Sequence, residues 1–198
     1  NYFENKIKTT IIPNDFQIDD LNVEEIVKTI QSEAVTDIFI ITNSDHLIKN
    51  IFSHLILNLD SESNLVIGQK ESGSIGRIKN IFLNSDKSKR ILISRADFFI
   101  NLLQKGLSHE NRKTLLIITK IPFENSKSPI NQMLCEKCSN AFIEFVIPKT
   151  SLQLKNLILE FANIKSREKE IIFFDQRIKN YNEAFIKSLE RLCNFIYL

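Results

Sequence analysis

The sequence predicts an α/β domain built on a parallel sheet of about six or seven strands, with helices on both faces. Short runs of β-branched and aromatic residues alternate along the chain with stretches whose apolar residues recur at helical spacing. The strand candidates are almost continuously apolar, which is typical of strands that helices cover on both sides. With 198 residues, 43% of them hydrophobic, the chain is long enough for one such domain, which we expect to span residues 1–198.

Each element follows from its local pattern. Strands are expected where Ile, Leu, Val and Phe run together, at residues 37–42, 64–68, 90–94, 114–119, 141–147 and 170–175. Helices are expected at residues 21–34, 44–59, 74–84, 97–106, 151–165 and 183–195. Asn22 stands where a helix cap is favoured, and Glu24 and Glu25 suit the positive N-terminal end of that helix.

Ligands of parallel sheets bind at the carboxyl ends of the strands. The segments that follow Thr42, Ser94 and Thr119 are therefore the places where we expect a binding site. A phosphate-binding loop is not among them, because none of the four glycines lies in a G-x-x-x-x-G-K-[ST] pattern. The chain is not expected to hold a nucleoside triphosphate by that route.

Net charge, cysteine content and apolar run length limit the classes of function that composition can predict. The formal net charge of +2 is too small to predict nucleic-acid binding from composition alone. Three cysteines cannot all pair with one another, so we expect free thiols and a protein located in the reducing cytoplasm. No uninterrupted apolar run approaches ~18 residues, and no contact with a membrane is expected.

Cys135 and Cys138 have the spacing of half a zinc or redox site. A structural zinc site needs four ligands, and neither Cys193 nor the scattered His46 and His54 supply a second pair. We therefore favour two ordinary thiols on a helix, expect no metal, and expect both histidines on the surface.

A small basic cluster consists of Lys87, Lys89 and Arg90. Polar and acidic residues are interleaved with it, so we interpret it as a solvated turn. An edge that contacts phosphate is the alternative.

The most distinctive stretch is TKIPFENSKSPINQM, residues 119–133. A strand end leads into Ile-Pro-Phe, and Pro129 stands where a proline opens a helix. This elbow resembles the "LPF…P-x-x-P" segment in the second motor domain of the DinG/XPD family of superfamily 2 DNA helicases. The resemblance covers about residues 10–190.

Further motifs of that family follow in register. DIFIITNSDHL resembles the strand with the "LFTSY" motif, with Thr42 and Asn43 on its Thr and Ser, and Gln69 matches the Gln after the next strand. ILISRADFFINLLQKG is similar to the "GTxSFWEGxDxxG" block, with Phe98 and Phe99 on its Phe-Trp. EIIFFDQRI resembles the "vvilDxR" sequence that follows the arginine-finger motif.

The chain departs from the family where the family contacts nucleotide. In the "SFWEGxD" block, the Glu, Gly and Asp fall on residues without that chemistry, Ile100, Asn101 and Leu103. In the "QGxGRxxR" motif, the Gln falls on Asn156, the two glycines fall on Leu157 and Leu159, and the two arginines fall on Glu160 and Asn163. An arginine finger stabilises charge on the transferred phosphoryl group, an effect of about 10³–10⁵ in rate. Glu160 would place a negative charge there instead.

The same segment is expected to form a helix. Leu154, Leu157, Ile158 and Phe161 recur at helical spacing and should pack on the sheet. Glu160 would then point toward the surface that faces the other motor domain in active relatives.

The resemblance implies a RecA-like fold and the C-terminal motor domain of an ATP-dependent DNA helicase of the DNA-repair type. ATP and Mg²⁺ are then cofactors of the intact helicase only. The expected partner is an upstream motor domain that carries the Walker motifs, in cis or in trans. The chain alone is expected to have no catalytic residues and no ATPase activity. The alternative is a catalytically dead, helicase-derived module for protein interaction.

The resemblance also places contacts with single-stranded DNA at the carboxyl ends of the strands. The expected residues are Thr42, Asn43, Gln69, Arg95 and Lys120. Hydroxyl, amide and cationic groups of this kind contact backbone phosphates. Binding should be weak, independent of sequence and sensitive to salt.

Overall fold

The computed structural model describes residues 6–12, 23–32, 37–103, 108–123, 129–175, 177–181 and 183–197. Within them, seven strands form one sheet in the order β3-β4-β2-β5-β6-β1-β7, and every neighbouring pair is parallel. The strands are β1 (Ile7–Ile11), β2 (Asp37–Ile41), β3 (Asn64–Gly68), β4 (Lys89–Ser94), β5 (Ser108–Ile118), β6 (Lys165–Phe173) and β7 (Cys193–Tyr197). The predicted α/β fold with a parallel sheet is confirmed.

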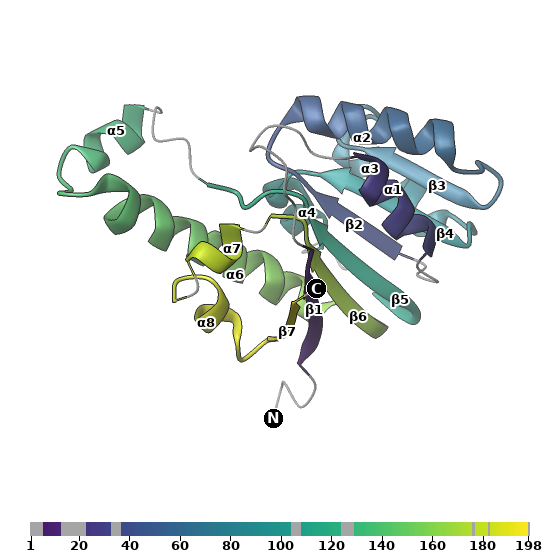
Figure 1. The fold of residues 1–198 in the computed structure, drawn as a ribbon. Coiled ribbons are helices and arrows are strands. Elements are labelled where there is room, and N and C mark those ends of the chain that lie inside the picture. The colour runs from purple at the N-terminus through teal and green to yellow at the C-terminus, as the bar shows by residue number, and fades with distance from the viewer. Residues whose placement is uncertain are drawn as a thin grey trace.

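Helices cover both faces of the sheet (Figure 1). Their bounds are α1 (Val23–Ser32), α2 (Asp45–Asn58), α3 (Ile75–Asn84), α4 (Ala96–Leu103), α5 (Pro129–Cys135), α6 (Ile147–Asn163), α7 (Arg177–Asn180) and α8 (Ile186–Leu189). On one face, α1 and α2 pack on β2, β4 and β5 through Ile26, Ile51 and their neighbours. On the other face, α3, α4, α6, α7 and α8 bury a second cluster that includes Phe82, Phe99 and Phe161.

Local sequence explains where the helices begin. The Ser44 hydroxyl accepts a hydrogen bond from the Leu47 N–H at the start of α2, and α5 begins at Pro129, as predicted. The proposed cap at Asn22 lies outside the described residues.

The expected strand at residues 141–147 is wrong. Residues Phe142–Val146 form a π-helical turn that continues directly into α6. Asn140 caps this turn, because its side-chain oxygen accepts from the Ile143 N–H while Glu144 accepts from the Asn140 N–H. Pro148, which has no N–H to donate, follows at the start of α6, a position where proline is tolerated.

The two ends of the chain also differ from expectation. The helix expected at residues 183–195 is reduced to the short α8, and the chain then forms β7. β1, which we did not expect, lies between β6 and β7 and pairs with both. Pairing between the two ends overrides the local helical spacing, because the backbone N–H and C=O groups of β1 and β7 form hydrogen bonds with each other.

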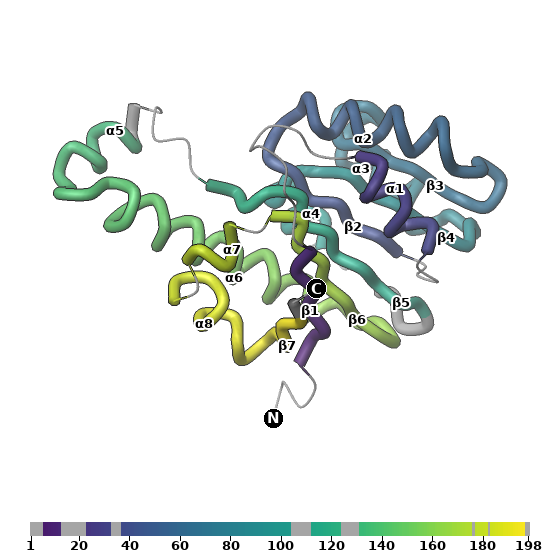
Figure 2. Tube along the Cα trace, viewed as in Figure 1, coloured from purple at the N-terminus to yellow at the C-terminus, as the bar shows by residue number. Residues whose placement is uncertain are grey.

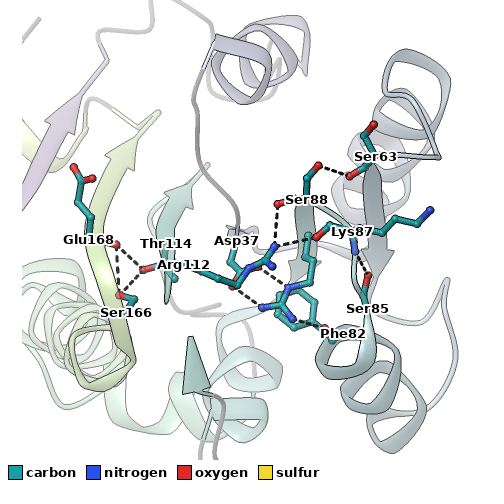
Figure 3. Close-up of polar contacts among 11 residues, drawn as sticks. Asp37, Ser63, Phe82, Ser85, Lys87, Ser88, Arg112, Thr114, Ser166 and Glu168 are labelled. Atoms are coloured by element: carbon teal, nitrogen blue, oxygen red, sulfur yellow. Dashed lines mark hydrogen bonds and ion pairs between the residues drawn. The ribbon is translucent and has the colours of Figure 1, made fainter. Parts of the chain in front are cut away.

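A buried ion cluster ties the central strands together at their amino ends (Figure 3). Asp37 at the start of β2 is fully buried and accepts two hydrogen bonds from Arg90 on β4, each of 2.7 Å. Arg112 on β5 donates to the same carboxylate at 3.0 Å, and the Arg90 guanidinium lies 4.7 Å from the centre of the Phe82 ring. We call Asp37, Arg90 and Arg112 the Asp37 cluster. The interpretation of Arg90 as part of a solvated turn is therefore wrong.

The Asp37 cluster should dominate the stability of the sheet. Asp37→Ala leaves two guanidinium groups facing a buried site without their counter-charge, which costs about 3–5 kcal/mol. Urea unfolding followed by circular dichroism measures the change. Asp86→Ala is the matched control, because Asp86 is exposed in the segment just before β4, and its loss should change the free energy of unfolding by less than about 0.5 kcal/mol. A loss below about 1 kcal/mol for Asp37→Ala would contradict this assignment.

Candidate nucleic-acid interface

A cavity of about 600 Å³ lies at the carboxyl ends of the central strands. It is bounded by the segments that follow β2, β4 and β5 and by the side of α6. Its lining residues are Thr42, Asn43, Arg95, Ala96, Asp97, Ile100, Pro122, Phe123, Gln153 and Asn156. The cavity is thus at the edge of the sheet where the sequence predicted a site, opposite the Asp37 cluster.

Two buried hydroxyls lie at this edge. Thr42 is 2% exposed and Ser94 is fully buried, and neither side-chain oxygen has a hydrogen-bond partner among the described residues. Their backbones continue the ladder, since the Thr42 N–H donates to the Ser94 carbonyl at 3.0 Å. A buried hydroxyl without a partner is costly, and such a group in a native protein is commonly completed by an ordered water or ion. Thr42 also lines the cavity.

Arg95 supplies the positive charge of the cavity. Gln69 positions the start of its segment, because the Gln69 Oε1 atom accepts a hydrogen bond of 2.8 Å from the Arg95 N–H. A hydrogen bond from Lys70 holds the pKa of Asp45 below its usual range, and the positive charge of Arg95 contributes to this shift. In the described part of the chain, charges of both signs therefore lie near the site.

The structure brings together most of the residues that the sequence indicated. Thr42, Asn43 and Arg95 line one cavity, and Gln69 is bonded to the backbone of Arg95. Lys120 follows β5 and is half-buried, but it is not among the residues that line the cavity.

One face of α6 continues the site. Gln153 and Asn156 line the cavity, and Glu160 and Asn163 follow them at intervals of four and three residues, which places all four along one side of the helix. The opposite side packs on the sheet through Leu154, Leu157, Ile158 and Phe161, all fully buried, as predicted. We call the first set the polar stripe of α6. It contains one acid and no cation.

The wall formed by Pro122 and Phe123 is held by residues whose role the sequence did not reveal. Asp175, just after β6, accepts a hydrogen bond of 2.8 Å from the Ile121 N–H and another of 2.8 Å from the Nε atom of Arg177. The Arg177 guanidinium lies 4.9 Å from the centre of the Phe123 ring. The Asp-Gln-Arg sequence thus fixes the elbow that follows β5. The motif match could have indicated this pairing, because both segments follow neighbouring strands.

The cysteines show no arrangement for metal binding. Cys135 ends α5 and Cys138 lies in the turn that follows, while Cys193 is buried in β7, and burial raises the pKa of its thiol to about 11. Within the described ranges, no group of three or more His, Cys, Asp and Glu side chains could hold a metal ion. In the same residues, no helix combines the length and apolar character needed to cross a membrane.

Comparison with known proteins identifies the fold. No protein-family model matches the chain, and no curated protein matches its sequence. Among solved structures, it is similar to the Hef helicase domain of Pyrococcus furiosus, with a TM-score of 0.55 and 9% sequence identity. The match covers 98% of this chain and 35% of that chain, so the present chain spans about a third of the length of its structural relative. The chain therefore shares the parallel α/β, RecA-like fold of that structure.

The hydroxyl of Thr42 should contribute nothing to the stability of the free protein. Thr42→Val removes an unsatisfied buried group and should leave the free energy of unfolding unchanged or raise it by up to about 1 kcal/mol. Thr119→Val is the matched control, because that hydroxyl donates to the Ile41 carbonyl at 3.0 Å, and its loss should cost about 1 kcal/mol. Equal losses in the two variants would mean that Thr42 has a structural partner.

Arginine at the two finger positions should be tolerated. Asn163 is exposed and Glu160 is half-buried on the polar stripe, so a long cation can reach solvent at either position. We expect Glu160→Arg and Asn163→Arg to change the free energy of unfolding by no more than about 0.5 kcal/mol, measured by thermal melts. A loss of several kcal/mol would show that this face is packed against a neighbouring segment.

Proposed function

We propose that the chain is the C-terminal motor domain of a divergent DinG/XPD-like DNA helicase, which contacts single-stranded DNA but supplies no arginine finger. The observation that carries this proposal is the cavity at the strand ends. It gathers Thr42, Asn43 and Arg95, which match or adjoin motif positions of that family, beside the polar stripe of α6. The order of the motifs along the sequence and the helicase-like fold support the same assignment.

Contacts with the DNA backbone suit the chemistry of this edge. The Asn43 amide and the Arg95 guanidinium can donate hydrogen bonds to phosphate oxygens, and Thr42 lies beside them with its hydroxyl buried in the free protein. The lining residues include one cation and one acid, Arg95 and Asp97, so electrostatic attraction is modest. Binding should therefore be weak and should involve few phosphates.

The polar stripe of α6 supports the absence of an arginine finger. Catalysis of phosphoryl transfer depends on cations placed against the transferred group. Glu160 and Asn163 occupy the two positions that the family fills with arginine, and the cation on this side of α6, Lys149, lies near the other end of the helix. ATP and Mg²⁺ would bind mainly to the upstream motor domain, which carries the Walker motifs and acts in cis or in trans.

A second candidate function is a protein-interaction module derived from a helicase. The observation that favours it is a helical arm, residues 129–152, which projects from the sheet (Figure 2). Among its described side chains, large apolar ones are exposed at Met133, Leu134, Phe142, Ile143 and Leu152. Exposed apolar patches of this kind mark surfaces that bind partners. Absence of DNA binding would favour this second function.

Titration with fluorescent single-stranded DNA tests the first function. We expect a dissociation constant on the order of tens of micromolar at low salt. The logarithm of the binding constant should fall with the logarithm of salt concentration with a slope of about −0.7 to −1.4, as for one or two phosphate contacts.

Two arginine variants locate the binding site. Arg95→Ala should weaken binding about 5- to 10-fold, because it removes the cation of the cavity. Arg167→Ala is the matched control: Arg167 is also exposed, but it lies in the first half of β6, at the opposite edge of the sheet, and its loss should change affinity less than about twofold. Equal effects of the two variants, or no binding at about 100 μM protein, would contradict the proposal.

A further inference from the structure

We propose that the cavity takes one nucleotide residue of a single strand, with its base inside the cavity and its phosphate at the rim near Arg95. This inference rests on the proposed function and adds base contacts to the backbone contacts described above. A volume of about 600 Å³ is within the range of sites that enclose small organic groups. The first reason to place a base in the cavity is that its lining is divided into an apolar wall and a polar wall.

The apolar wall suits the flat face of a base. Ala96, Ile100, Pro122 and Phe123 form it, from the segments that follow β4 and β5. Phe123 is held from several sides, with ring-centre distances of 5.7 Å to Phe142 and 6.0 Å to Phe185, and with Arg177 over its ring. An apolar surface that is already fixed binds a base without the entropic cost of ordering side chains.

The polar wall suits the edge of a base. Gln153 and Asn156 reach the cavity from successive turns of α6, and each amide offers both a donor and an acceptor. Unstacked bases are recognised through such mixed donor and acceptor groups on their edges.

The charge of the lining selects a ligand with little net charge. Among the described residues of the lining, Arg95 and Asp97 are the ionisable side chains, one of each sign, so their formal charges cancel. A nucleoside triphosphate would need several cations or a metal ion here, and the described part of the lining supplies the single cation Arg95. A nucleotide residue within a strand carries a single phosphodiester charge, which one guanidinium at the rim can neutralise.

Two strands that differ only in their bases test the inference. A fluorescent oligothymidylate is compared with a strand of equal length and charge in which every base is absent. If the cavity holds a base, the abasic strand should bind at least about fivefold more weakly at the same salt concentration. Equal affinities would overturn the inference and leave backbone binding intact, whereas no binding of either strand would overturn the proposed function and the inference together.

Two asparagine variants test whether the contact with the base lies in the cavity. Asn156→Ala should weaken binding of the oligothymidylate about 3- to 10-fold and leave the abasic strand unaffected. Asn80→Ala, which changes an exposed asparagine on α3 outside the cavity lining, should affect neither strand. Equal weakening of both strands by Asn156→Ala would assign Asn156 to the backbone and overturn the inference, as would an unchanged affinity for the oligothymidylate.

Discussion

The buried carboxylate of Asp37 is the constraint on which the rest of the structure depends. A charge with no exposed surface is tolerated only when partners of opposite charge and hydrogen bonds compensate it, and here two guanidinium groups do so from the two neighbouring strands. Arg112 also donates to the carbonyls of Lys87 and Ser88, and these bonds attach the segment just before β4 to β5. The contact therefore fixes three central strands in a single register.

That register determines where the site is formed. β2 has only five residues, so a sheet fixed at Asp37 also fixes Thr42 immediately beyond its other end. Polar groups are satisfied at the amino edge of the sheet, whereas Thr42 and Ser94 are left without partners at the carboxyl edge. Proteins accept such local costs where a ligand binds, and the rest of the fold offsets them. The contrast between the two edges is the physical basis for placing function at the cavity.

The sequence predicted the centre of the sheet better than its ends. The strands at 37–42 and 114–119 could be predicted because they are nearly all apolar and are buried on both faces. The apolar run at 141–147 also predicts a buried strand, but it lies on a helical turn where Phe142 and Ile143 are exposed. β1 and β7 were missed because their pairing joins the two ends of the chain, and local patterns carry no information about it.

The site was predictable in part. Its strand-end residues follow from the rule that parallel sheets bind ligands at their carboxyl edge, but the contributions of Gln153 and Asn156 depend on how α6 lies across that edge. The role of Arg90 was not visible, because a basic cluster in sequence does not reveal that one member faces a buried acid on another strand. The pairing of Asp175 with the elbow at Ile121 needed the same knowledge of strand order.

The most direct test of the account is a nuclear magnetic resonance titration of the isotope-labelled chain with single-stranded DNA. Backbone amide shifts report which residues sense the strand. If DNA binds at the cavity, the largest changes should occur around residues 42–43, 95–97 and 153–156, with none at the Asp37 cluster. Changes concentrated on the helical arm, around Met133 and Ile143, or spread over the amino edge of the sheet would contradict the assignment of the cavity as the nucleic-acid site.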